Sequence, residues 1–216
     1  MTLATIPLSM PRQVNRAILT ATVALGGAAL IALVALALAL EDSQRLFASL
    51  IFGACLLLCS ACSYLYNMLE TRWRPALRML DHGAIFLLIA GTYTPFVVTG
   101  IKGPFGLGLL EGVWGLALAG IAMKLFLRGR GDRLFVALYL ALGWLFLSAL
   151  QSFIALNSFP SLILLLIGGI AYTVGAAIYF RGIGPWTEAV WHGCVFVGSL
   201  SHLLAVIALR LAPPLL

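Results

Sequence analysis

The sequence predicts an all-α, polytopic membrane protein in which seven transmembrane helices form a bundle, and three observations support this fold class. Hydrophobic residues make up 62% of the chain and charged residues 9%, whereas soluble proteins hold roughly 45–50% and roughly 25%. The mean hydropathy is +1.09. The chain also contains seven long apolar runs. Together these features exclude a soluble enzyme, a disordered chain and a secreted disulfide scaffold.

The seven apolar runs justify the helices one by one. Each run holds about 20 residues, which is the length that a helix rising ~1.5 Å per residue needs to cross a ~30 Å hydrocarbon core. Their continuous, leucine- and alanine-rich character favours helices over the alternating ~10-residue strands of a barrel. In chain order, the expected spans are residues 17–40, 46–69, 80–100, 105–127, 134–154, 160–180 and 187–210.

The connections between these runs are too short to hold a further domain. Residues 41–45 are polar, residues 70–79 carry three arginines, and residues 128–133 combine arginine with glycine and aspartate. The sequence shows no convincing internal repeat and no low-complexity tract. We therefore expect a single domain over residues 1–216.

The distribution of basic residues predicts the orientation of the bundle. Ten of the thirteen lysines and arginines fall on the side that holds the N-terminus. Because basic loops stay in the cytoplasm, we expect the N-terminus inside the cell and the C-terminus outside. The net charge of +6 then faces anionic lipid and, without a clustered basic face, predicts no nucleic-acid partner. The two sets are Arg12, Arg16, Arg72, Arg74, Arg78, Lys124, Arg128, Arg130, Arg133 and Arg181, against Arg45, Lys102 and Arg210.

Polar residues inside the spans mark the candidate site, because an ionisable group at mid-membrane costs about 2.5–3.5 kcal/mol. Ser63 and Asn67 are four residues apart and share a face of the second span. Glu188 and His192 share a face of the seventh span in the same way. Asp81 lies near the inner end of the third span. We expect these five side chains to meet in one layer near the cytoplasmic surface.

Three segments around these residues resemble the hemolysin III family of bacterial membrane proteins. The stretch from Leu80 to Phe96, LDHGAIFLLIAGTYTPF, is very similar to the third-helix signature of that family. The segment SYLYN, which ends at Asn67, resembles a second-helix Ser-x-x-x-His motif. The segment EAVWH, followed by GSLSH, resembles a seventh-helix His-x-x-x-His motif and its trailing histidine, His202. The family is grouped with adiponectin/progestin-type receptors and, more distantly, with alkaline ceramidases.

The resemblance implies a zinc centre that this sequence has altered. In the superfamily, one histidine from the second helix and two from the seventh hold zinc, while an aspartate and a serine support a bound water. His192, Asp81 and Ser63 match these positions. Asn67 and Glu188 stand where the other two histidines belong. Because an amide oxygen is a weak zinc ligand and a carboxylate is a better one, the altered site is richer in oxygen.

The first functional hypothesis is a metal-dependent hydrolase that cleaves ester or amide bonds of membrane lipids, which is the activity that the resemblance implies. The metal ligands would be His192, Glu188, Asp81 and Asn67, and the ion Zn²⁺ or a harder cation such as Mn²⁺ or Mg²⁺. The metal would activate a bound water. Asp81 would act as ligand or base and Ser63 would orient the water, so these two are the candidate catalytic residues.

The alternative hypothesis is a metal-free protein. In it the same side chains form a hydrogen-bonded network with a proton-relay, pore-forming or lipid-sensing role. A histidine beside a carboxylate can titrate near neutral pH, which suits such a role. Under either hypothesis the resemblance implies an integral protein of the bacterial inner membrane whose partners are membrane lipids.

Overall fold

The computed structural model describes residues 9–101, 103–128, 130–156 and 159–211. Every extended regular element within these ranges is a helix, which confirms the all-α class. Seven of the segments in this part of the chain are long and apolar enough to cross a membrane. The elements are α1 (Met10–Ala39), α2 (Ser43–Met68), α3 (Arg74–Gly100), α4 (Pro104–Phe126), α5 (Asp132–Trp144), the 3₁₀ helix η1 (Leu145–Ala149), α6 (Leu150–Leu156), α7 (Phe159–Arg181) and α8 (Thr187–Leu211).

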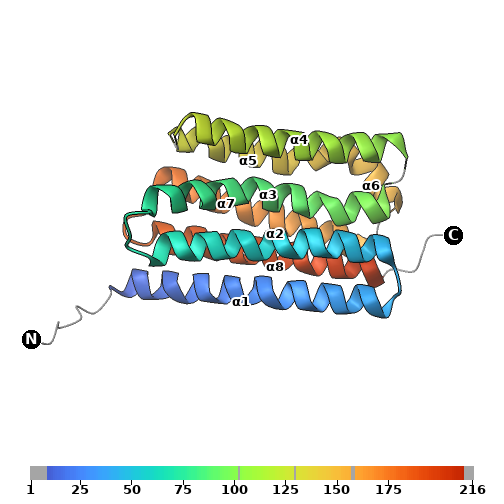
Figure 1. The fold of residues 1–216 in the computed structure, drawn as a ribbon, viewed down its shortest axis with the longest axis horizontal. Helices are drawn as coiled ribbons and strands as arrows, with labels where there is room; N and C mark the ends of the chain where they lie inside the picture. The colour runs from blue at the N-terminus through green and yellow to red at the C-terminus, as the bar shows by residue number, and fades with distance from the viewer. Residues whose placement is uncertain (1–8, 102, 129, 157–158, 212–216) are drawn as a thin grey trace, which may run out of the picture.

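The spans pack side by side in chain order and close into a ring (Figure 1). Each of α1 to α4 contacts the next helix, α5 contacts α4 and α7, and α8 contacts both α7 and α1. Helix α3 also contacts α5 and α8, so it lies nearest the centre of the bundle. Helix α1 begins and α8 ends at opposite ends of the bundle, as an odd number of spans requires (Figure 1).

Helix α1 begins seven residues before the expected start at residue 17. Pro11 stands in its first turn, where proline is tolerated because the N–H it lacks has no partner there. The buried residues of α1 recur at helical spacing, which is the pattern of a helix with one face against its neighbours. They are Asn15, Leu19, Thr22, Gly26, Ala29, Leu33 and Ala37.

The fifth span is not one continuous α-helix. Residues 132–152 form a single apolar span, but η1 interrupts it between α5 and α6. At its start, Gly131 adopts φ 84°, a left-handed conformation that favours glycine. This turn places Asp132 at the first residue of α5, facing α3 and α4.

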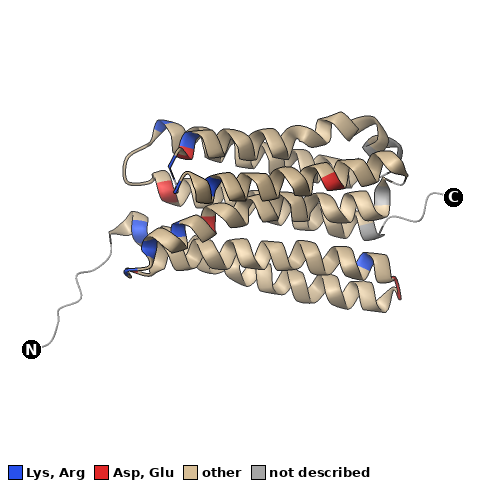
Figure 2. Cartoon of the chain, turned by 45° about the horizontal axis from the view of Figure 1, so that its top comes forward, with Lys and Arg blue, Asp and Glu red and all other residues tan. Residues whose placement is uncertain are grey.

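Charged residues gather at one end of the bundle. Figure 2 shows most lysines and arginines at the end where α1 begins, and few at the other. Of the three basic residues assigned to the far side, Lys102 and the side chain of Arg210 lie outside the described part of the structure. The charges are therefore segregated as the sequence predicts, and the cytoplasmic identity of the basic end stays a prediction.

Candidate functional site

A polar cavity of about 340 Å³ opens within the basic end of the bundle. Its lining comes from α1, α2, α3, α5, α7 and α8. The five polar residues singled out in the sequence all line it. They are Ser63, Asn67, Asp81, Glu188 and His192. Residues that are 129 positions apart in the chain thus contribute to one site, because the ring closes α8 against α1 and brings it near α3.

His192 is a buried residue in the lining of this cavity, with 7% of its surface exposed. Its Nε2 atom lies 3.5 Å from the hydroxyl oxygen of Ser63 on α2. Its Nδ1 atom lies 2.7 Å from the side-chain oxygen of Asn15 on α1. The imidazole therefore links three helices, and we call Asn15, Ser63 and His192 the polar trio.

Asn15 is a site residue that the sequence analysis missed. The first span was expected to begin at residue 17, because Arg12 and Arg16 depress the hydropathy just before it. In the structure both arginines are exposed, while Asn15 points inward and is 6% exposed. The signal was present in the sequence, since Asn15 extends the buried stripe of Leu19 and Thr22 back by one turn.

Asp81 and Asn67 flank Ser63 on different sides. The buried carboxyl group of Asp81, on α3, lies within hydrogen-bonding reach of the Ser63 side chain. The Asn67 amide instead donates to the backbone carbonyl of Ser63, at 2.9 Å. Because an amide nitrogen carries two N–H groups, one of them stays available to the cavity.

The donor set does not fit a three-ligand catalytic metal centre. Glu188 is exposed at the rim of the cavity. Asn67 is bonded to its own helix, and one ring nitrogen of His192 is engaged by Asn15. Among the residues that the structure describes, no group of three or more His, Cys, Asp or Glu side chains is placed to hold a metal ion. The ligand roles of His192, Glu188, Asp81 and Asn67 stay predictions.

A second set of polar side chains forms an ion cluster of Arg78, His82, Lys124 and Asp132. All of these except Lys124 also line the polar cavity. The Asp132 carboxylate bonds to Arg78 and to Lys124, whose Nζ atom is 3.0 Å away. The His82 ring approaches the same carboxylate at 3.7 Å. Lys124 is only 1% exposed and also lies over the ring of Phe135. The cluster ties α3, α4 and α5 together.

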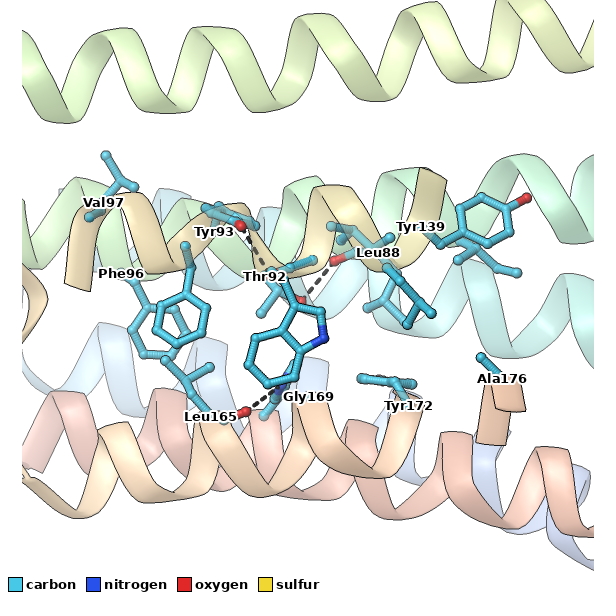
Figure 3. Close-up of a pocket in the computed structure, with 18 of the residues that line it drawn as sticks. Leu88, Thr92, Tyr93, Phe96, Val97, Tyr139, Leu165, Gly169, Tyr172 and Ala176 are labelled. Carbon is cyan, nitrogen blue, oxygen red and sulfur yellow. Dashed lines mark hydrogen bonds between the residues drawn. The ribbon is translucent and has the colours of Figure 1, made fainter. Parts of the chain in front are cut away.

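An apolar chamber of about 130 Å³ adjoins the polar cavity. Figure 3 shows it between aromatic and aliphatic side chains, with Phe96 and Leu165 towards one end and Tyr139 and Ala176 towards the other. Tyr139 and Tyr172 line both spaces, so the two are neighbours. The molecule therefore offers a polar compartment near the basic end and a hydrocarbon-like compartment next to it.

Comparison with known proteins gives a consistent result. A family model described as haemolysin-III related matches residues 16–203. A hemolysin-3 homolog of Bacillus subtilis (strain 168) is 36% identical over 158 residues, which cover 73% of this chain and 74% of that protein. Hemolysin-3 of Bacillus cereus is 36% identical over 129 residues, covering 60% and 59% respectively. No solved structure matches.

Proposed function

This chain belongs to the haemolysin III family, and on that premise we propose that it is a membrane-embedded hydrolase of ester or amide bonds in lipids. The observation that carries the proposal is the content of the polar cavity. A serine hydroxyl, an imidazole and a carboxyl group, from Ser63, His192 and Asp81, line one cavity. Hydrolysis requires a group that attacks a carbonyl carbon and a base that takes a proton, and these residue types supply both.

The neighbouring compartments suit a lipid substrate. A lipid ester or amide joins a polar headgroup to a hydrocarbon chain, and the cavity and the chamber offer surroundings of these two kinds. With its hydrocarbon chain in the chamber, a lipid would pass Tyr139 and Tyr172, which line both spaces, and extend its polar part into the cavity that Ser63 lines. The chamber is lined mainly by apolar and aromatic side chains, so an acyl chain can move into it from the bilayer without exposing apolar surface to water.

A separate question is whether the proposed hydrolysis depends on a metal ion. Because the described donors do not form a three-ligand group, the proposal assigns no step to Zn²⁺, Mn²⁺ or Mg²⁺. A stoichiometric metal that disappears in His192→Ala would restore the metal-dependent form. We expect less than one metal ion per chain after purification without added metal, as measured by elemental mass spectrometry.

The proposed setting is the bacterial inner membrane, with the polar cavity at the cytoplasmic leaflet. The segregation of basic residues supports this orientation (Figure 2). A cysteine placed at Arg130, which is exposed in the basic α4–α5 loop, is expected to react with a membrane-impermeant maleimide only after the cells are opened. Reaction in intact cells would reverse the orientation.

The experiment that tests hydrolysis uses the full chain in vesicles. The purified protein is reconstituted separately with phosphatidylethanolamine, phosphatidylglycerol and ceramide, and released fatty acid is quantified by mass spectrometry. We expect time-dependent release from at least one lipid class and its loss in His192→Ala. Ser49→Ala is the matched control, because Ser49 lies on α2 far from the cavity and bonds only to the backbone of Arg45. No release from any lipid would refute the hydrolase.

A second candidate function is a proton relay or lipid sensor. The observation that favours it is the continuous chain from Asn15 through His192 to Ser63, which links α1, α8 and α2. Such a chain passes a proton only if the imidazole can take one up and release it. Proton flux into vesicles that hold a pH-sensitive dye, in the absence of lipid cleavage, would select this function.

A further inference from the structure

The polar trio has the connectivity of a nucleophile, a base and an orienting group. The Ser63 hydroxyl faces Nε2 of His192 at 3.5 Å, and Nδ1 of the same ring faces the Asn15 oxygen at 2.7 Å. In hydrolases that act through serine or cysteine, the base bonds to the nucleophile through one ring nitrogen and to an orienting side chain through the other. Asparagine is one of the orienting residues that nature uses in this role.

The partners of His192 determine which ring nitrogen carries its proton. The Asn15 side-chain oxygen is an acceptor, so Nδ1 must be the donor in that short contact. The backbone carbonyl of Glu188, one turn earlier on α8, is a second acceptor for the ring. A neutral imidazole protonated at Nδ1 keeps its lone pair at Nε2, and this is the atom that faces Ser63.

We propose that Ser63 is a covalent nucleophile, with His192 as its general base and Asn15 as the residue that positions the imidazole. This inference rests on the proposed hydrolase function and names its machinery. The Ser63–His192 distance is at the long end of a hydrogen bond, as is common in such sites before substrate binds. Burial of His192 and Asn15 keeps bulk water from competing for their contact.

The reaction is balanced with water as the only co-reactant. The Ser63 oxygen forms a bond to the lipid carbonyl carbon while its proton moves to Nε2 of His192. The bond from that carbon to the alcohol oxygen or amine nitrogen then breaks, and His192 returns the proton to the leaving group. Water attacks the resulting acyl ester, gives its proton to His192, and the fatty acid leaves as Ser63 recovers the proton.

Asp81 and Asn67 occupy supporting places around the nucleophile. A serine hydroxyl has one proton, so it donates either to the Asp81 carboxyl group or to His192. Transfer to the base requires the second orientation. The free N–H of the Asn67 amide lies on the same helix as Ser63, one turn away, where it can donate to a negatively charged carbonyl oxygen.

The Ser63 proton and a metal ion would compete for the same atom, Nε2 of His192. A metal held by His192 would need the lone pair of Nε2, because Asn15 engages Nδ1. The same lone pair is what accepts the Ser63 proton. Serine chemistry therefore predicts activity that a chelator leaves unchanged, whereas metal chemistry predicts activity that a chelator removes.

The experiment labels the nucleophile directly. The full chain, in mild detergent with EDTA, is treated with an alkyl fluorophosphonate. Attack by Ser63 forms an oxygen–phosphorus bond and releases fluoride, and mass spectrometry of the digested chain locates the label. We expect labelling at Ser63, none at that position in Ser63→Ala, and wild-type labelling in the Ser49→Ala control. A folded wild-type chain that stays unlabelled at Ser63, or that is labelled only after zinc is added, overturns the proposal.

The labelling experiment tests the serine nucleophile, and the lipid assay tests the hydrolase, so the two proposals can fail independently. Labelled Ser63 without cleavage of any lipid supports the nucleophile and removes lipid as its substrate. Lipid cleavage by a chain that is unlabelled at Ser63 and inhibited by EDTA supports the hydrolase and overturns the serine mechanism. Each result thus identifies which of the two proposals is at fault.

The role of Asn15 is tested by rescue. Asn15→Leu removes the acceptor and is expected to slow labelling of Ser63 by at least about tenfold per folded molecule, a modest part of what acid–base catalysis contributes. Asn15→Asp keeps an acceptor oxygen in place and is expected to label within a few-fold of the wild type. Equal rates in all three proteins would show that Asn15 does not position the base. A loss in both variants would also contradict the assignment.

Discussion

Two polar clusters lie at the same end of the bundle, and they differ in the interaction that holds them together: one is ion-paired and the other is hydrogen-bonded. The ion cluster joins α3, α4 and α5 through one carboxylate, Asp132, shared by two fixed cations. The polar trio joins α1, α2 and α8 through neutral hydrogen-bonding groups around His192. The first cluster compensates charge, whereas the second leaves a basic nitrogen facing a hydroxyl across a loose contact.

The difference separates groups that hold the helices together from groups that are available for chemistry. Lys124 is 1% exposed, so its charge is tolerable only beside Asp132. The Ser63 hydroxyl lies 3.5 Å from the His192 ring, and it lines a cavity that a substrate can fill. We therefore expect variants in the ion cluster to affect stability first, and variants in the polar trio to affect activity first.

The largest effect on stability is expected for Asp132→Ala. It leaves Lys124 as an uncompensated buried charge, which costs about 3–5 kcal/mol. The free energy of unfolding in detergent, from a denaturant titration, measures the loss. Asp42→Ala is the matched control, since the Asp42–Arg45 pair is more exposed and its loss, together with that of a helix cap, costs about 1–2 kcal/mol. Equal losses in the two variants would contradict the ion-cluster account.

Lys124→Met is expected to destabilise less than Asp132→Ala. The Asp132 carboxylate keeps Arg78 as a partner, and methionine fills the space over Phe135 with an apolar chain of similar length. The same titration compares the two variants. A larger loss for Lys124→Met would mean that the lysine, and not the carboxylate, is the hub of the cluster.

Asn15→Leu is expected to cost about 1–3 kcal/mol, because the His192 Nδ1–H then lacks its side-chain acceptor inside the bundle. Thermal unfolding in detergent measures it. Asn15→Asp, which retains an acceptor, should lie closer to the wild type. A loss in Asn15→Leu as large as that in Asp132→Ala would erase the distinction between the two clusters.

The smallest structural change is expected for the double variant Asn67→His with Glu188→His. Both positions line the cavity near His192, so the variant supplies three histidines to one site. We expect it to bind up to one zinc per chain without loss of stability, as measured by elemental mass spectrometry. Glu111→His, on α4 and away from the cavity, is the control. Zinc content equal to that of the wild type would show that the two positions do not converge.

The spans were predictable because the length of an apolar run is a local property of the sequence. The convergence of Ser63, Asp81 and His192 was predictable because helical spacing and membrane depth limit where a side chain can lie. Asn15 was missed, since flanking arginines moved the expected start of its helix past it.

The ion cluster was missed for a different reason. Lys124 was expected to serve the basic cytoplasmic surface, but packing of α4 against α5 buries it beside Asp132. Which cation meets which carboxylate is set by how the helices pack against one another. Sequence spacing carries no such information for residues on different helices.

The serine mechanism requires that Ser63→Ala lose its turnover. Fatty acid released per folded molecule is measured in lipid vesicles, with EDTA present, for the wild type, Ser63→Ala and Ser49→Ala. We expect Ser49→Ala to match the wild type and Ser63→Ala to fall by at least about 10²-fold while its unfolding free energy changes by about 1 kcal/mol or less. Undiminished release by Ser63→Ala would show that this hydroxyl is not the nucleophile.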